Sequence, residues 1–198
     1  MSYQNQLNIK AVYDLSTIKE REDGRLWYPQ ALKIARGLAA RYRVSLECSA
    51  GVLAALSPRN KWTRNCTDCE AMISLFKADP ESAADYKACT FGANKKKALR
   101  ILTENPIKSE RVLEILSGPK LKEFYSCIMG LPEICIDGHA FSLWDGGRIT
   151  LAKIPSIGVK LRREIKKDYE SVATDLNIPG SELQAVTWVT WRRIHGVG

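Results

Sequence analysis

The sequence predicts an all-α protein. Apolar residues recur at helical spacing in most segments, no segment alternates with a period of two, and proline or glycine separates the periodic segments. The chain of 198 residues is long enough for one domain with its own core, or for one domain divided into two lobes. We therefore expect a single domain over residues 1–198, built as a helical bundle of one or two lobes.

The individual helices follow from this spacing and from the breakers between them. In the segment 26–42, Leu32, Ala35 and Leu38 share a face, and Pro29 falls in the first turn. The nearly continuous apolar stretch 44–56 predicts a buried central helix that stops before Pro58. The other expected helices cover residues 62–77, a short segment from Pro80, 94–104, 109–116, 120–129, 138–144, 157–176 and 181–194, the last with Ser181 as its N-cap.

The charge balance favours a polyanionic partner. Lys and Arg number 30 against 22 Asp and Glu, a formal net charge of +8. A basic cluster can be a solvated helix face, and the run over residues 160–167 circles a helix in that way. The clusters that fall at expected turns instead indicate nucleic acid, and they are Arg59/Lys61/Arg64, Lys95–Lys97 with Arg100, Lys120/Lys122 and Arg192/Arg193.

Other properties of the chain exclude several classes. No apolar run approaches the roughly 18 residues of a membrane span, and the first residues lack the basic and apolar regions of a signal peptide, so we expect a cytoplasmic protein without a membrane partner. Among the six cysteines, Cys66 and Cys69 form one C-x-x-C on an expected helix, with no second pair or histidine pair nearby. We expect reduced cysteines that serve mainly in packing, and neither a metal nor another cofactor.

Five blocks of residues resemble, in the same order, the helix-hairpin-helix DNA glycosylases of the endonuclease-three type. The blocks lie within about residues 44–196 and are Ala54–Arg59, Phe91–Ala98, Leu113–Lys122, Ile136–Phe141 and Trp188–Gly196. The resemblance implies a glycosylase-like helical bundle with a helix-hairpin-helix. It also implies that the partner is double-stranded DNA carrying a modified or damaged base. We expect a monomer.

The resemblance gives Asp137 the role of an essential aspartate. A carboxylate beneath the sugar stabilises the cation that forms as the N-glycosidic bond breaks, or activates the attacking nucleophile. Asp137 is also placed to N-cap the following helix, and the two roles are compatible. Lys120 lies nearest the register of the lysine that attacks the sugar in some members, with Lys122 second; both lysines could instead contact phosphate.

The same blocks and the charge clusters suggest the DNA contacts. At Gly118 the backbone can approach a phosphate at a helix start. His139 either bonds a backbone carbonyl or contacts phosphate, and Trp62 is either a core aromatic or stacks on a base. The expected DNA-contacting residues are Gly118, Arg59, Asn60, Lys61, Asn94, Lys95, Lys96 and His139.

Some residues depart from the family pattern. The hairpin has one glycine fewer, Gly138 follows Asp137 in place of threonine, and the four spaced cysteines of an iron–sulfur cluster are absent. The chain also resembles a set of phage proteins related to enzymes of thymine hypermodification, which would place a phage-encoded protein in the host cytoplasm. The alternatives to a glycosylase are therefore a transferase acting on a flipped hypermodified thymine, and a non-catalytic DNA-binding protein.

Overall fold

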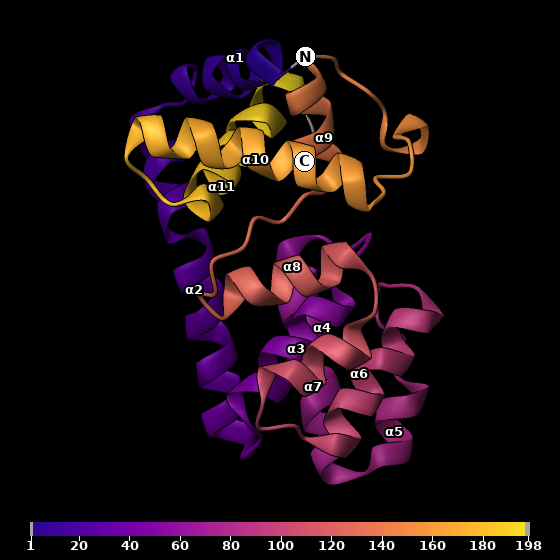
Figure 1. The fold of residues 1–198 in the computed structure, drawn as a ribbon. Coiled ribbons are helices and arrows are strands. Elements are labelled where there is room, and N and C mark those ends of the chain that lie inside the picture. Colours follow the sequence, from indigo (N-terminus) through magenta and orange to yellow (C-terminus); the bar gives the residue numbers. More distant parts are fainter. Residues whose placement is uncertain (1, 197–198) are drawn as a thin grey trace. The chain divides into compact units, whose positions relative to one another are not determined.

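The computed structural model describes residues 2–196, and across them the secondary structure is helical without strands (Figure 1). The expected all-α fold is confirmed. Residues 1, 197 and 198 of the expected domain lie outside the described residues. The chain divides into two compact units: a terminal unit of residues 1–29 and 130–198, and a central unit of residues 30–129.

Eleven α-helices and one 3-10 helix occupy residues 2–196, and within this range none of them is both long and apolar enough to cross a membrane. The helix α2 (Ile18–Tyr42) contributes to both units. The terminal unit also contains α1 (Ser2–Asp14), α9 (Gly138–Asp145), η1 (Leu151–Lys153), α10 (Val159–Leu176) and α11 (Gly180–His195). The central unit also contains α3 (Leu46–Leu56), α4 (Trp62–Ala78), α5 (Pro80–Asp85), α6 (Gly92–Glu104), α7 (Ser109–Leu116) and α8 (Pro119–Ile128).

The central unit is organised around α3. Every residue from Cys48 to Leu56 is buried, and α4, α6, α7 and α8 all contact this helix. Ser45 caps its start, where the hydroxyl accepts a hydrogen bond from the Cys48 backbone N–H at 2.9 Å. The prediction of a buried central helix is confirmed, with its first residue at Leu46.

A tight turn joins α7 to α8 within the central unit (Figure 1). Ser117 and Gly118 both have positive φ, 28° and 99°, and Pro119 opens α8 with a φ already suited to a helix. Helix, two-residue turn and helix therefore occur where the sequence predicted them.

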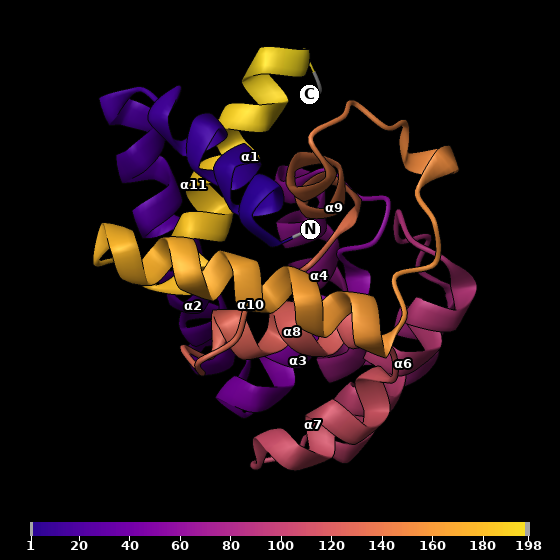
Figure 2. The same ribbon diagram turned by 45° about the horizontal axis from the view of Figure 1, so that its top comes forward.

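The terminal unit packs α1, α9, α10 and α11 around a shared core (Figure 2). Ile9 and Val12 of α1 enter this core together with Tyr169 of α10 and Leu183 of α11. Ile134 and Ile136, in the buried segment that leads into α9, belong to the same core, so the start of α9 is held by packing on several helices.

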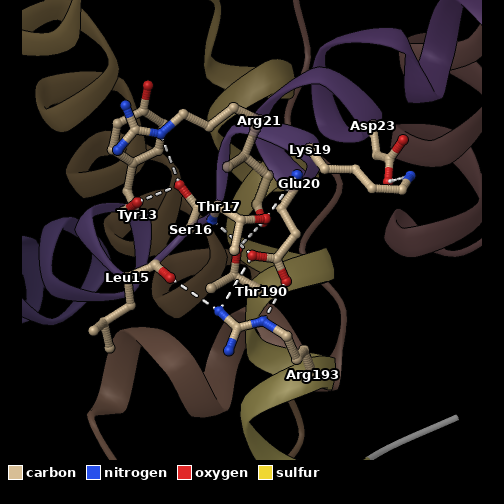
Figure 3. Close-up of polar contacts among 11 residues, drawn as sticks. Tyr13, Leu15, Ser16, Thr17, Lys19, Glu20, Arg21, Asp23, Thr190 and Arg193 are labelled. Carbon is tan, nitrogen blue, oxygen red and sulfur yellow. Dashed lines mark hydrogen bonds and ion pairs between the residues drawn. The ribbon is translucent and has the colours of Figure 1, made fainter.

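The turn between α1 and α2 is fastened to α11 by a buried carboxylate (Figure 3). Thr17 and Glu20 form a capping box: the Glu20 N–H donates to Thr17 Oγ1 at 3.2 Å, and the Thr17 N–H donates to the Glu20 carboxylate at 2.8 Å. Arg193 donates to the same carboxylate at 2.6 and 3.2 Å and to the Leu15 carbonyl at 2.9 Å. These bonds tie the start of α2 to the end of α11.

Two expectations about the starts of helices were wrong, and one helix was missed. Pro29 lies inside α2 instead of in a first turn, because the capping box starts the helix eleven residues earlier at Ile18. The N-cap of α11 is Pro179, so Ser181 already lies within the helix. The sequence interpretation also gave no helix for α1, whose place is decided by packing on α9, α10 and α11.

Two glycines in α2 should respond oppositely to alanine. A Cβ on Gly24 would lie 2.5 Å from Val186 Cγ2 and 2.6 Å from the Val186 Cα, so Gly24→Ala should destabilise the protein by about 1–3 kcal/mol. A Cβ on Gly37 would meet nothing within 4 Å, so Gly37→Ala should stabilise it by about 0.5–1 kcal/mol. Thermal unfolding followed by circular dichroism measures both; equal shifts would contradict the close packing at Gly24.

Candidate functional site

Asp137 occupies the N-cap position of α9. Its backbone is extended, with φ −106° and ψ −174°, and its carboxylate accepts a hydrogen bond from the Ala140 N–H at 2.9 Å. The partial positive charge of a helix start also favours a carboxylate there. The N-cap interpretation is confirmed, and because the side chain remains partly exposed, the charge is both fixed and accessible.

Buried groups support the segment that carries Asp137. Arg162 of α10 donates from Nη1 to the Ile136 carbonyl at 2.8 Å, and both residues are buried. Tyr169, also on α10, is 0% exposed; burial first and then the negative charge of Asp137 raise the pKa of its hydroxyl. The hydroxyl is therefore neutral at physiological pH, and the backbone beneath Asp137 is held by a buried arginine.

Two histidines and one arginine of the terminal unit lie within electrostatic reach of one another. His139 is half-buried on the first turn of α9, and the His195 ring packs against Trp191 with centroids 4.0 Å apart. Burial, followed by the positive charges of Arg148 and His139, lowers the pKa of His195 below its ordinary value of 6.5. His139 and Arg148 thus lie near His195 in the unit that contains Asp137, and the lowered pKa keeps His195 neutral at physiological pH.

The predicted hairpin residues lie at the start of α8. Gly118 and Lys120 are exposed, whereas Lys122 is half-buried. The Lys122 N–H donates to the Gly118 carbonyl at 3.3 Å, which forms the first turn of the helix. Lys97 of α6 donates from Nζ to the Ser117 carbonyl at 3.3 Å, so the hairpin and the lysine cluster of α6 lie together in the central unit.

The loop before α4 carries four of the predicted residues. Arg59 is exposed with a left-handed φ of 59°, and its guanidinium carbon lies 4.9 Å from the centroid of the Phe91 ring. Lys61 is exposed at the N-cap of α4. Trp62 is half-buried and packs edge-on against Phe124, with centroids 6.3 Å apart. The Trp62 ring thus makes a packing contact and keeps part of its surface exposed, which agrees with both interpretations.

The start of α6 holds three further predicted residues. Lys96 is exposed, but Lys95 donates a hydrogen bond to the Ala84 carbonyl. Asn94 is only 8% exposed and its side chain bonds Thr90 Oγ1 at 3.5 Å and Lys97 Nζ at 3.4 Å. Of these three side chains, Lys96 is the one most accessible to a phosphate.

A buried carboxylate that the sequence interpretation missed organises this surface. Asp68 of α4 is 0% exposed and its two oxygens accept four hydrogen bonds. The donors come from three segments of the central unit and are Arg64 Nε at 2.7 Å, Tyr86 Oη at 2.8 Å, the Cys89 N–H at 2.8 Å and Asn60 Nδ2 at 3.1 Å. The loop that precedes α4 and the loop that precedes α6 therefore share one anchor.

The ionisation of Asp68 follows from these bonds. Burial opposes the charge, but the hydrogen bonds from Cys89, Tyr86, Arg64 and Asn60 outweigh it and keep the pKa of Asp68 below its ordinary value of 3.8. No local motif reveals such a residue, because its donors are separated from it by 4 to 21 positions and meet only in the folded unit.

Four of the six cysteines are packed in the interior, whereas Cys66 is half-buried and Cys89 is exposed. Cys48, Cys69, Cys127 and Cys135 are buried, and burial raises the pKa of Cys48 to about 12, so its thiol is protonated at neutral pH. Among the residues described, no group of three or more His, Cys, Asp or Glu side chains could hold a metal ion.

The chain belongs to a family of unknown function (DUF7178), whose match covers residues 2–195. No curated protein and no solved structure matches the chain significantly.

Loss of the Asp68 charge should destabilise the protein. Asp68→Asn removes a charged acceptor that holds two loops, and we expect a cost of about 1.5–3 kcal/mol in the free energy of unfolding. Asp85→Asn, at an exposed aspartate of α5 in the same unit, is the control and should change stability by less than about 0.5 kcal/mol. Denaturant unfolding at neutral pH gives both values.

The effect of Asp68→Asn on stability should depend on pH. Because folding lowers the pKa of Asp68, its contribution to stability is present in full above the ordinary value of 3.8 and is lost as the pH falls through the lower folded value. The stability difference between wild type and Asp68→Asn should therefore shrink in acid, below about pH 4. A difference that stays constant or grows in acid would contradict the assignment.

Proposed function

We propose that this protein is a DNA base-processing enzyme, a DNA glycosylase that flips a modified or damaged base and excises it with the help of Asp137. The proposal rests on one observation above all: a partly exposed carboxylate fixed at the start of α9 by the Ala140 N–H. The resemblance of the surrounding residues, Ile136–Phe141, to the essential motif of the endonuclease-three type agrees with it.

Cleavage of the N-glycosidic bond is favoured by a fixed negative charge near the sugar. As the bond between C1′ and the base nitrogen breaks, its electron pair leaves with the base and C1′ becomes cationic. Asp137 stabilises this cation, or takes a proton from the water that attacks C1′, and the departing base gains a proton. Because the Ala140 N–H already orients the carboxylate, little reorganisation is required during the reaction.

Binding of DNA is supported by basic groups in each unit. In the terminal unit the exposed Arg148 lies near His195, and His139 is on the first turn of α9. The central unit has the hairpin at Gly118 and the lysines that follow it. Flipping a base costs a few kcal/mol, about what several phosphate contacts can offset, and such contacts make the affinity fall with salt.

Replacing Asp137 by asparagine should separate chemistry from binding. Asparagine is also a good N-cap, so α9 should keep its start, and only the charge is lost. We expect base release to fall by about 100-fold or more while the Kd for DNA stays close to that of the wild type. Mass spectrometry of free bases and nucleosides after incubation with DNA of normal and hypermodified pyrimidines measures release, and Asp145→Asn at the other end of α9 is the control.

The products also decide between the alternatives. Undiminished base release by Asp137→Asn would refute the role of this residue. A nucleoside of new mass without free base would identify a transferase on a modified pyrimidine. Salt-sensitive binding with no covalent change in any DNA would leave a DNA-binding protein.

Lys120 is proposed as the amine that can replace water at C1′. Attack by its nitrogen displaces the base and leaves an imine between the lysine and the opened sugar, which borohydride reduces to a stable protein–DNA bond. We expect trapping by the wild type and by Lys122→Gln, and its loss in Lys120→Gln. Denaturing gel electrophoresis detects the product; equal trapping by both variants would assign the two lysines to phosphate contacts.

A further inference from the structure

An aromatic ring lies exposed at the surface of the central unit beside an arginine. Phe91 is 48% exposed although it precedes α6 directly, and the Arg59 guanidinium carbon lies 4.9 Å from its ring centroid. A guanidinium at this distance is attracted to the ring face and aligns a flat cationic group with an apolar one. This combination is suited to a flat, electron-rich partner.

The pair is held in place by the loops that carry it. Thr90 Oγ1 donates to the Pro58 carbonyl at 3.3 Å, so the two loops bond directly on either side of the pair. The Asp68 carboxylate accepts hydrogen bonds from Asn60 Nδ2 and from the Cys89 N–H. Asn60 follows Arg59 directly, and Cys89 lies in the loop that leads to Phe91. The backbone that carries the two side chains is thus held in place on both sides of the pair.

Arg59 has an unfavourable backbone conformation at this point. Its φ of 59° costs a residue with a side chain roughly 1–2 kcal/mol, and a glycine would adopt it freely. Such strain persists where the surroundings enforce it, and here the neighbours of Arg59 are fixed, Asn60 by its bond to Asp68 and Pro58 by its bond from Thr90. An arginine at a position that favours glycine points to a use for its side chain.

The surroundings of the pair are cationic. Lys61 and Lys96 are exposed on the adjoining loop and helix, and α6 begins without a side-chain cap, which leaves backbone N–H groups at its first turn. An apolar ring within a basic surface favours a polyanion that also carries aromatic groups, which describes a nucleic acid with an accessible base.

We propose that Arg59 and Phe91 form a stacking site for an unpaired nucleobase of DNA. The inference rests on the proposed function in taking DNA as the ligand, and adds that a base outside the helical stack is recognised by the central unit. It places stacking on Phe91 in place of Trp62, whose ring packs on Phe124. The lysines contact the backbone on either side of the stacked base.

Equilibrium binding of the full chain to two DNAs tests the site. One is a fully paired duplex and the other is the same duplex with one bulged nucleotide, 2-aminopurine. We expect Phe91→Ala to weaken binding of the bulged duplex about 10-fold and of the paired duplex much less, because a stacked base contributes about 1–3 kcal/mol. The quenching of 2-aminopurine fluorescence by the wild type should disappear in this variant and return in Phe91→Tyr.

Two further variants separate binding from folding. Ile107→Ala removes an exposed apolar side chain of the same unit, 75% exposed, and should change neither affinity. Arg59→Gly removes the guanidinium but relieves the positive φ, so the thermal midpoint should stay or rise while binding of the bulged duplex weakens. A purely structural role of Arg59 predicts a lower midpoint instead.

Equal losses on both duplexes, or unchanged quenching in Phe91→Ala, would overturn the stacking site. These results are independent of base release, which is measured separately on the same proteins. If Phe91→Ala loses affinity for the bulged duplex alone and no DNA releases a base, the stacking site is retained and the glycosylase is refuted. Base release by the protein, together with unchanged DNA affinity in Phe91→Ala, would support the glycosylase and refute the stacking site.

Discussion

The burial of α3 from Cys48 to Leu56 is the constraint on which the central unit depends. Gly51, in the middle of this helix, leaves room for its neighbours, since a Cβ there would lie 2.8 Å from Val112 Cγ1 and 3.2 Å from Ile101 Cδ1. The helices α6 and α7 can therefore both pack closely on α3. As a result the start of α6 and the turn after α7 meet at one end of the unit, where Lys97 bonds the Ser117 carbonyl. Apolar packing at α3 thus decides which basic groups are neighbours.

Asp68 is the polar counterpart of this packing. Helices that pack on α3 leave long loops between them, and hydrophobic contacts alone do not fix a loop that carries charged side chains. A buried carboxylate with four donors does so, and each donor satisfies part of the charge that burial would otherwise penalise. Arg59 can then occupy a conformation that it would not choose, because the cost is offset by bonds made elsewhere in the unit.

The sequence predicted most of what depends on neighbouring residues. The helices of the central unit were placed to within about two residues, since Pro58, Pro80 and Pro119 act locally. The start of α2 was missed although the Thr17–Glu20 capping box is a local signal that could have revealed it. The helix α1 is a different case: its place is decided by burial of Ile9 and Val12 against distant helices, which periodicity in a polar segment does not disclose.

The candidate site likewise has a part that depends on neighbouring residues and a part that depends on distant segments. The cap made by Asp137 spans three residues and could be predicted, whereas the donors of Asp68 and the Arg59–Phe91 pair come from segments that only folding brings together. The two aspartates also differ in burial, which separates the structural carboxylate from the one that is proposed to react. Asp68 is fully buried and accepts hydrogen bonds from four donors, so its charge stabilises the two loops. Asp137 is oriented by Ala140 and remains partly exposed, which is what the proposed reaction at a sugar requires of it.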